Sequence, residues 1–259
     1  MSVAYEARAA SGLEGLGLTV AREQLDSVAQ RAAAEAWSYS HFLGFLLEGE
    51  LHARHERTVK LNLQFARLPY LKRLEDFDRQ AQPGLDPRLL DELATTRFLD
   101  EARNIVFLGP PGTGKTHLAI ALAVLVAERG HRIYFAHAID LARRLTQALA
   151  ENRLRREMNN LTRPRLLVLD EVGYLALDTT QASLLFQVLC ERYERRQPVV
   201  LTSNKAFADW AHVFAGDAVM ASAALDRLLH RSTVVHIRGD SYRLKEKRQA
   251  GAEAALTPG

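Results

Sequence analysis

Residues 104–116 read NIVFLGPPGTGKT. The last eight of them, Gly109-Pro110-Pro111-Gly112-Thr113-Gly114-Lys115-Thr116, match G-x-x-x-x-G-K-[ST] at every fixed position. An apolar run precedes the motif and an amphipathic run follows it, which predicts a strand, a glycine-rich turn and a helix. Such a turn points backbone N–H groups at phosphates, and the helix N-terminus adds positive charge. The segment therefore predicts an ATP-binding P-loop.

Two side chains of this loop have separate expected roles. Lys115 is predicted to reach the β- and γ-phosphates, and the Thr116 hydroxyl to bind Mg²⁺. We expect all eight residues from Gly109 to Thr116 to contribute to the nucleotide site.

Two later strands end in polar residues. Leu166 to Asp170 is an apolar strand beside the P-loop strand, and Asp170 at its end is predicted to hold magnesium. Glu171 is then placed to act as a general base towards a water that attacks the γ-phosphate. Asn204, which closes the strand PVVLTSN between the other two, is predicted to contact that water or the γ-phosphate.

The order of patterns along the chain predicts an α/β fold with a P-loop parallel sheet flanked by helices. Strands and helices alternate from residue 104 onwards, which is typical of a parallel sheet. The first third has helical periodicity, over 18–36 and 40–68. We expect a helical N-terminal domain (1–70), a linker rich in turn residues (71–103), an ATPase domain (104–248) and a flexible tail (249–259).

Composition narrows the class of protein. Hydrophobic residues make up 47% and charged residues 25%, which excludes a disordered or collagen-like chain. The single cysteine, Cys190, cannot form an intramolecular disulfide, and the chain starts without a signal-peptide pattern. The longest apolar run, 118–127, is far shorter than the roughly 20 residues that cross a bilayer. We expect a cytoplasmic protein with no membrane partner.

Basic residues gather in three segments although the net charge is only +3. Residues 50–73 hold six Lys or Arg against two Glu, residues 141–165 hold seven Arg against two Glu, and residues 227–248 are similar. Each segment fits either a solvated helix face or a surface for a polyanion such as DNA.

Taken together, the motifs resemble the IstB family, the ATP-dependent transposition helpers of bacterial insertion sequences. The resemblance covers nearly the whole chain and includes GPPGTGKTHLAIALA, LLVLDEVGYLALD, LLFQVLCERYERRQPVVLTSN and ALDRLLHRSTVVHIRGDSYRLK. It implies an AAA+ ATPase similar to the helicase loader DnaC. It also implies that Arg227 reaches the γ-phosphate of a neighbouring subunit, and that Arg243 is a sensor within its own subunit. Little or no C-terminal lid is expected, since only 20 residues follow Gly239.

The implied function is an ATP-controlled homo-oligomer that assembles on double-stranded DNA and recruits or activates a partner transposase. DNA contacts are expected on the basic segments, mainly to phosphates. The candidates are Arg54, Arg57, Lys60, Arg143, Arg144, Arg153, Arg155 and Arg156.

Two alternatives stay open. A DnaC-like loader of a replicative helicase shares every ATPase motif and differs only in the use of its N-terminal region. A small-molecule P-loop kinase is the other, but Glu171 directly after Asp170 favours hydrolysis on water.

Overall fold

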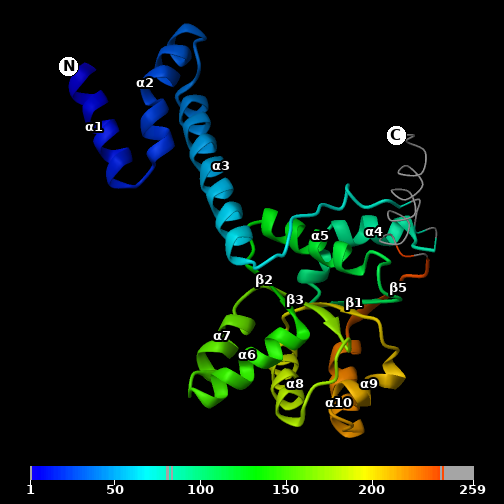
Figure 1. Cartoon of the computed structure of the whole chain (residues 1–259). Coiled ribbons are helices and arrows are strands. Elements are labelled where there is room, and N and C mark those ends of the chain that lie inside the picture. Colours follow the sequence, from blue (N-terminus) through cyan, green and yellow to red (C-terminus); the bar gives the residue numbers. More distant parts are fainter. Residues whose placement is uncertain (1, 80–81, 83, 240, 242–259) are drawn as a thin grey trace, which may run out of the picture. The chain divides into compact units, whose positions relative to one another are not determined.

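The computed structural model describes residues 2–79, 82, 84–239 and 241 (Figure 1). Contacts divide the chain into two compact units, residues 1–61 and 62–259. No helix among the described residues is long and apolar enough to cross a membrane.

The first unit is helical and is held together by a small apolar cluster and one buried carboxylate. It contains α1 (Ser2–Gly15), α2 (Thr19–Ala34) and the start of α3 (Tyr39–Phe65), whose last residues belong to the second unit. The first turn of α2 has no side-chain cap of its own. Glu50 from α3 supplies one, because its carboxylate accepts hydrogen bonds from the N–H groups of Val20 (2.8 Å) and Ala21 (3.2 Å).

The second unit is built around one five-stranded parallel sheet in the order β2-β3-β4-β1-β5. Its strands are apolar almost throughout, as expected of a sheet that is covered on both faces. The strands are β1 (Asn104–Leu108), β2 (Ile133–His137), β3 (Leu166–Val172), β4 (Val199–Ser203) and β5 (Ser232–His236).

Helices cover both faces of this sheet (Figure 1). Ile105 and Phe107 of β1 join α4 and α5 in one apolar cluster, whereas Val106 and Leu108 join α6, α8 and α10 in another. The helices are α4 (Pro87–Ala94), α5 (Lys115–Glu128), α6 (Ala138–Ala150), α7 (Leu154–Thr162), α8 (Thr179–Glu194), α9 (Trp210–Val213) and α10 (Ala218–Leu229), with 3-10 turns at Arg97–Leu99 and Phe207–Asp209.

The predicted parallel α/β fold and the preceding helices are confirmed, with one correction. The strand that ends in Asp170 does not lie beside the P-loop strand. The strand closed by Asn204, which was expected between these two, does lie there, because β4 pairs with both β1 and β3 and separates them. Residues 71–103, expected as a linker, carry α4 and place Leu90, Leu93 and Phe98 in the core. Residues 242–259, where the tail and the end of the ATPase domain were expected, lie outside the described part.

Candidate nucleotide-binding site

The loop between β1 and α5 requires glycine at three positions. Gly109 has φ +157°, and a Cβ there would lie 2.2 Å from the Ile237 carbonyl oxygen. Gly112 has φ +79°, and its Cβ would lie 2.2 Å from Ser241 Oγ. Gly114, before the first residue of α5, has φ +92°. A side chain would strain the backbone at each of the three positions, and at Gly109 and Gly112 it would also collide with the segment after β5. The motif glycines therefore give the loop its shape.

The polar side chains of the loop bond back to it. Thr113 Oγ1 and Lys115 Nζ both donate to the Pro110 carbonyl, at 2.9 and 2.6 Å. Thr113 and Lys115 are buried, whereas Pro110 and Pro111 are exposed. The lysine ammonium is therefore held against the loop by the Pro110 carbonyl.

Three side chains meet at the carboxyl ends of the strands. Thr116 Oγ1 lies 2.9 and 3.1 Å from the two oxygens of Asp170, and Thr202 Oγ1 donates to Asp170 Oδ1 at 2.6 Å. Asp170 is buried, and two hydroxyls bond its carboxylate. Hard oxygen donors of this kind are the ligands that Mg²⁺ prefers, and it usually takes one or two carboxylates together with substrate phosphates.

Glu171 leaves the sheet at an irregularity of β3. The register between β3 and β4 shifts between Leu169 and Val172, and Glu171 takes a left-handed φ of +59°. Its N–H donates to Thr202 Oγ1 at 2.9 Å, while its side chain is 47% exposed. A non-glycine residue in this conformation is uncommon and is found at functional sites, where surrounding contacts hold it. The shift turns the carboxylate out from the buried strand.

His137, at the end of β2, is paired with Asp170 across the sheet. Its Nδ1 lies 3.4 Å from Asp170 Oδ2 and 3.8 Å from Glu171 Oε2, and this buried atom has no hydrogen bond in the described part of the chain. Sequence reasoning missed both His137 and Thr202. The available signal was the same for each, a polar residue at the end of an otherwise apolar strand.

The remaining predicted site residues lie in different places. Asn204 directly follows β4, at the edge where Asp170 lies, and is exposed. Arg227 lies on α10, which leads into the start of β5, and β5 begins beside Asn104, the first residue of β1. The P-loop follows the last residue of β1, so the four steps of this strand separate the two ends by roughly 13 Å. Arg243 falls outside the described residues.

The candidate DNA-binding side chains differ in whether they form hydrogen bonds or ion pairs with other residues of the chain. Arg54 bonds Glu50 and the Gly17 carbonyl, and Arg144 bonds Tyr134 and Glu157. Arg143 and Arg153 pair with Asp140 and Glu151 respectively. Four of the candidates are exposed and form no ion pair among the described residues: Arg57, Lys60, Arg155 and Arg156.

These observations fit ATP with magnesium. The glycine loop leaves no room for side chains where phosphate oxygens must approach the backbone, and Lys115 stands at its wall. Thr116 and Asp170 already lie within hydrogen-bond distance, so one cation can be held between their oxygens and a phosphate.

Comparison with known proteins agrees with this site. The insertion sequence IS21 protein of Pseudomonas aeruginosa, named for ATP binding, is 48% identical over 227 residues, covering 88% of this chain and 85% of that one. The corresponding IS5376 protein of Geobacillus stearothermophilus is 44% identical over 233 residues, covering 90% and 92%.

Solved structures share the fold. The crystal structure of DnaI has a TM-score of 0.55 at 22% identity and covers 68% of this chain and 93% of that one. AMPPCP-bound DnaA from Aquifex aeolicus has a TM-score of 0.53 at 23% identity and covers 73% and 57%. Residues 11–250 match the family model of IstB-like ATP-binding proteins. Because this family model matches most of the chain, and because two close relatives are ATP-binding proteins of insertion sequences, the chain belongs to this family.

Proposed function

We propose that this protein is an ATPase of the AAA+ type that assists transposition of an insertion sequence. It binds MgATP at the P-loop and hydrolyses it when a second copy completes the site. It assembles on double-stranded DNA and recruits or activates a partner transposase. The observation that carries the proposal is Glu171, turned out of the sheet beside an Asp170 that Thr116 and Thr202 already hold.

The residues of the site divide the work of hydrolysis. Lys115 exchanges the Pro110 carbonyl for oxygens of the β- and γ-phosphates. Thr116 and Asp170 would hold magnesium, which would supply positive charge to neutralise those phosphates. Glu171 accepts a proton from the attacking water, and Asn204 orients that water. His137 lies near both carboxylates, where it can restrain the direction of Glu171.

Arg227 is the residue that makes ATP hydrolysis depend on assembly. It stands at the amino ends of the strands, and its own P-loop is at the carboxyl ends. An arginine that stabilises the transition state must contact the γ-phosphate. Arg227 can therefore serve only a nucleotide on another copy, which makes turnover depend on association.

DNA and transposase are the expected partners because both close relatives are proteins of insertion sequences. The proposed phosphate contacts are the basic side chains on α3 and α7 that form no ion pair within the described part of the chain, above all Arg57, Lys60, Arg155 and Arg156. Arg243 is proposed as the second sensor of the nucleotide. A role on bacterial DNA, as the relatives from bacterial insertion sequences suggest, implies that the protein acts in the cytoplasm.

The decisive experiment measures ATP turnover and particle size for wild type, Glu171→Gln and Arg227→Ala, with and without plasmid DNA. We expect DNA to raise wild-type turnover. Glu171→Gln should assemble on DNA with ATP yet not hydrolyse it, and Arg227→Ala should bind ATP without turnover. Turnover that ignores DNA in a protein that stays monomeric with ATP would refute the assembly and transposition claims.

Recruitment needs its own measurement. The proposed partner transposase should bind DNA-bound, ATP-loaded Glu171→Gln but not the Lys115→Ala variant. If a replicative helicase binds instead, the protein is a helicase loader and the transposition proposal is wrong.

A further inference from the structure

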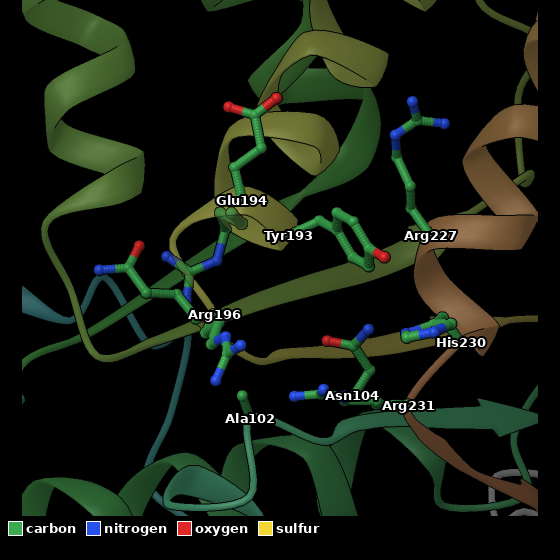
Figure 2. Close-up of a pocket in the computed structure, with 10 residues that line it drawn as sticks. Ala102, Asn104, Tyr193, Glu194, Arg196, Arg227, His230 and Arg231 are labelled. Carbon is green, nitrogen blue, oxygen red and sulfur yellow. The ribbon is translucent and has the colours of Figure 1, made fainter.

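A pocket of about 250 Å³ opens at the amino ends of β1, β4 and β5, the edge opposite the P-loop (Figure 2). Residues from three separate segments line it: the start of β1, the end of α8 with the turn that follows, and the end of α10. The lining side chains that matter most are Asn104, Tyr193, Arg196, Arg227, His230 and Arg231.

The pocket is strongly basic, with Arg196 and Arg231 exposed and Arg227 half-buried. In the described part of the chain, Arg196, Arg227 and Arg231 form no ion pair, and Glu194 is the one acidic residue of the lining. Arg227 bonds the Ala223 carbonyl and lies over the Phe186 ring at 5.3 Å.

The arginines stand at two places in the pocket. Figure 2 shows Arg227 on one side of the Tyr193 ring, and Arg196 and Arg231 on the other, towards Ala102 and Asn104. Tyr193 itself packs edge-on against His230, with ring centroids 5.8 Å apart. The pocket therefore offers cations along its length and not at a single point.

A buried arginine fixes the turn that carries Arg196. Arg192 is fully buried, and its guanidinium donates to the carbonyls of Leu161 (2.7 Å), Pro164 (3.2 Å), Arg165 (3.3 Å) and Pro198 (2.7 Å). These bonds tie the end of α7 and the start of β3 to the turn between α8 and β4. Arg192 adds a further positive charge beneath the pocket.

The backbone around the other arginines is held equally well. Arg196 takes a left-handed φ of +52° after the end of α8, and its N–H donates to the Tyr193 carbonyl. Asn104 bonds the Leu228 carbonyl and the Val199 N–H through its side chain, both at 2.8 Å, and the Arg231 carbonyl through its own N–H. The positions from which the side chains project are therefore set before any ligand arrives.

We propose that this pocket receives the phosphates of the ATP carried by a neighbouring copy, and that Arg196 and Arg231 bind phosphate oxygens there together with Arg227. Guanidinium groups match phosphate oxygens as paired donors. Three of them that form no ion pair with a described carboxylate make a receptor for a polyanion. The inference rests on the proposed function, because it deepens the role of Arg227 in trans. A nucleic-acid backbone offers the same phosphate chemistry, so the test separates the two sources.

The test uses mixtures of full-length variants. Arg196→Ala/Arg231→Ala keeps its own P-loop and Arg227, and we expect it to lose at least about tenfold in ATP turnover. Lys115→Ala should be inactive but keeps an intact pocket. Mixed in equal amounts on DNA, the two should recover turnover, to about a quarter of the wild-type rate per copy for random head-to-tail neighbours. Recovery also proves that the double variant is folded.

Two controls accompany the mixture. Arg195→Ala removes the neighbouring arginine, which pairs with Glu191 and does not line the pocket, and it should keep wild-type turnover. Lys115→Ala mixed with Glu171→Gln should stay inactive, because both changes damage the same side of the interface. Arg196→Lys/Arg231→Lys should restore part of the turnover that the alanine variant loses.

The experiments distinguish failure of this inference from failure of the proposed function. If Arg227→Ala abolishes turnover and Arg196→Ala/Arg231→Ala keeps the wild-type rate, the proposed function stands and this inference is overturned. If the double variant keeps its turnover but loses affinity for duplex DNA in a gel shift, the pocket binds a nucleic-acid backbone and the inference is again overturned. Wild-type protein without ATP turnover overturns both.

Discussion

At the scale of single residues, Thr202 contacts both Asp170, the proposed magnesium ligand, and Glu171, the proposed base. Its hydroxyl donates to Asp170 and accepts from the Glu171 N–H. It therefore orients one carboxylate and supports the backbone that turns the other outwards. Groups that orient metal ligands typically change metal affinity or activity by about 10- to 100-fold when they are removed.

Thr202→Val should accordingly lower ATP turnover by about 10- to 100-fold and raise the Mg²⁺ concentration needed for half-maximal rate. A magnesium titration of ATP hydrolysis measures both. Thr162→Val is the matched control. Thr162 is equally buried, and among the described residues its hydroxyl bonds only the Met158 carbonyl, within its own helix. Equal magnesium requirements for wild type and Thr202→Val would contradict this role.

Arg192 illustrates a second residue-scale effect, on stability. Burial, followed by the neighbouring charges of Arg165 and Arg195, lowers the pKa of Arg192 to about 9, so it is still charged near neutral pH. Its four carbonyl partners would lose their donor in Arg192→Met. We expect a loss of about 3 kcal/mol in the free energy of unfolding, because buried acceptors left unpaired are costly.

Urea unfolding followed through the buried Trp210, in a Trp37→Phe background, measures that loss. Arg195→Met, which removes only a surface ion pair with Glu191, should change the free energy of unfolding by less than about 1 kcal/mol. Similar values for the two substitutions would mean that the carbonyl bonds of Arg192 contribute nothing.

At the scale of elements, α2 depends on a residue from another helix. Burial raises the pKa of the Glu50 carboxyl, but hydrogen bonds from Ala21 and Val20 and the contact with Arg54 outweigh it, so the pKa lies below its ordinary value of 4.5. A lowered folded pKa means that this stabilisation is present above pH 4.5 and is lost as pH falls through the folded value.

Hydrogen exchange of peptides covering α2 in the full chain, corrected for intrinsic rates, tests this cap. Wild-type protection should fall with pH below 4.5, whereas Glu50→Gln should be less protected at neutral pH and should lack that step. Glu48→Gln, on the same helix and exposed, should behave as wild type. An unchanged acid response in Glu50→Gln would show that another group controls α2.

The same scale shows what the sequence can predict. The strands with apolar runs and the helix after the P-loop are predicted within a few residues, because their periodicity is local. The order of strands is not local. The expected position of β4 between β1 and β3 is confirmed, but the expectation that the Asp170 strand lies beside the P-loop strand was wrong for the same reason. The helix α4 was missed because Pro83, Gly84 and Pro87 were taken for linker residues, although Pro87 opens the helix and Asp86 caps it.

The residues of the candidate site also fall into those that the sequence could identify and those that it could not. The P-loop, Asp170 and Glu171 could be identified because each motif is contiguous in the sequence. Thr202 and His137 could not, since they join the site only through strand pairing and the register shift after Leu169. Likewise, the convergence of Arg196 and Arg231 on the pocket of Arg227 depends on three segments far apart in the chain.

At the scale of the whole molecule, a site completed by a second copy makes the rate depend on concentration. Turnover per copy should rise as protein concentration increases and level off once assembly is complete. Arg227→Ala should give a low, flat curve over the same range. A dilution series with saturating MgATP measures this, and a wild-type rate per copy that is constant from nanomolar to micromolar protein would contradict the dependence.

The opposite positions of the P-loop and Arg227 also give any such assembly a direction. Copies that join these two edges stack head to tail, so a row of them has two unlike ends. At one end the last ATP faces solvent and meets no arginine, so it persists while interior nucleotides are consumed. The terminal copy would then hydrolyse its ATP slowly, and the row could grow or shorten at different rates at its two ends. The timing of ATP hydrolysis would thereby set both the length of the complex and its direction along DNA.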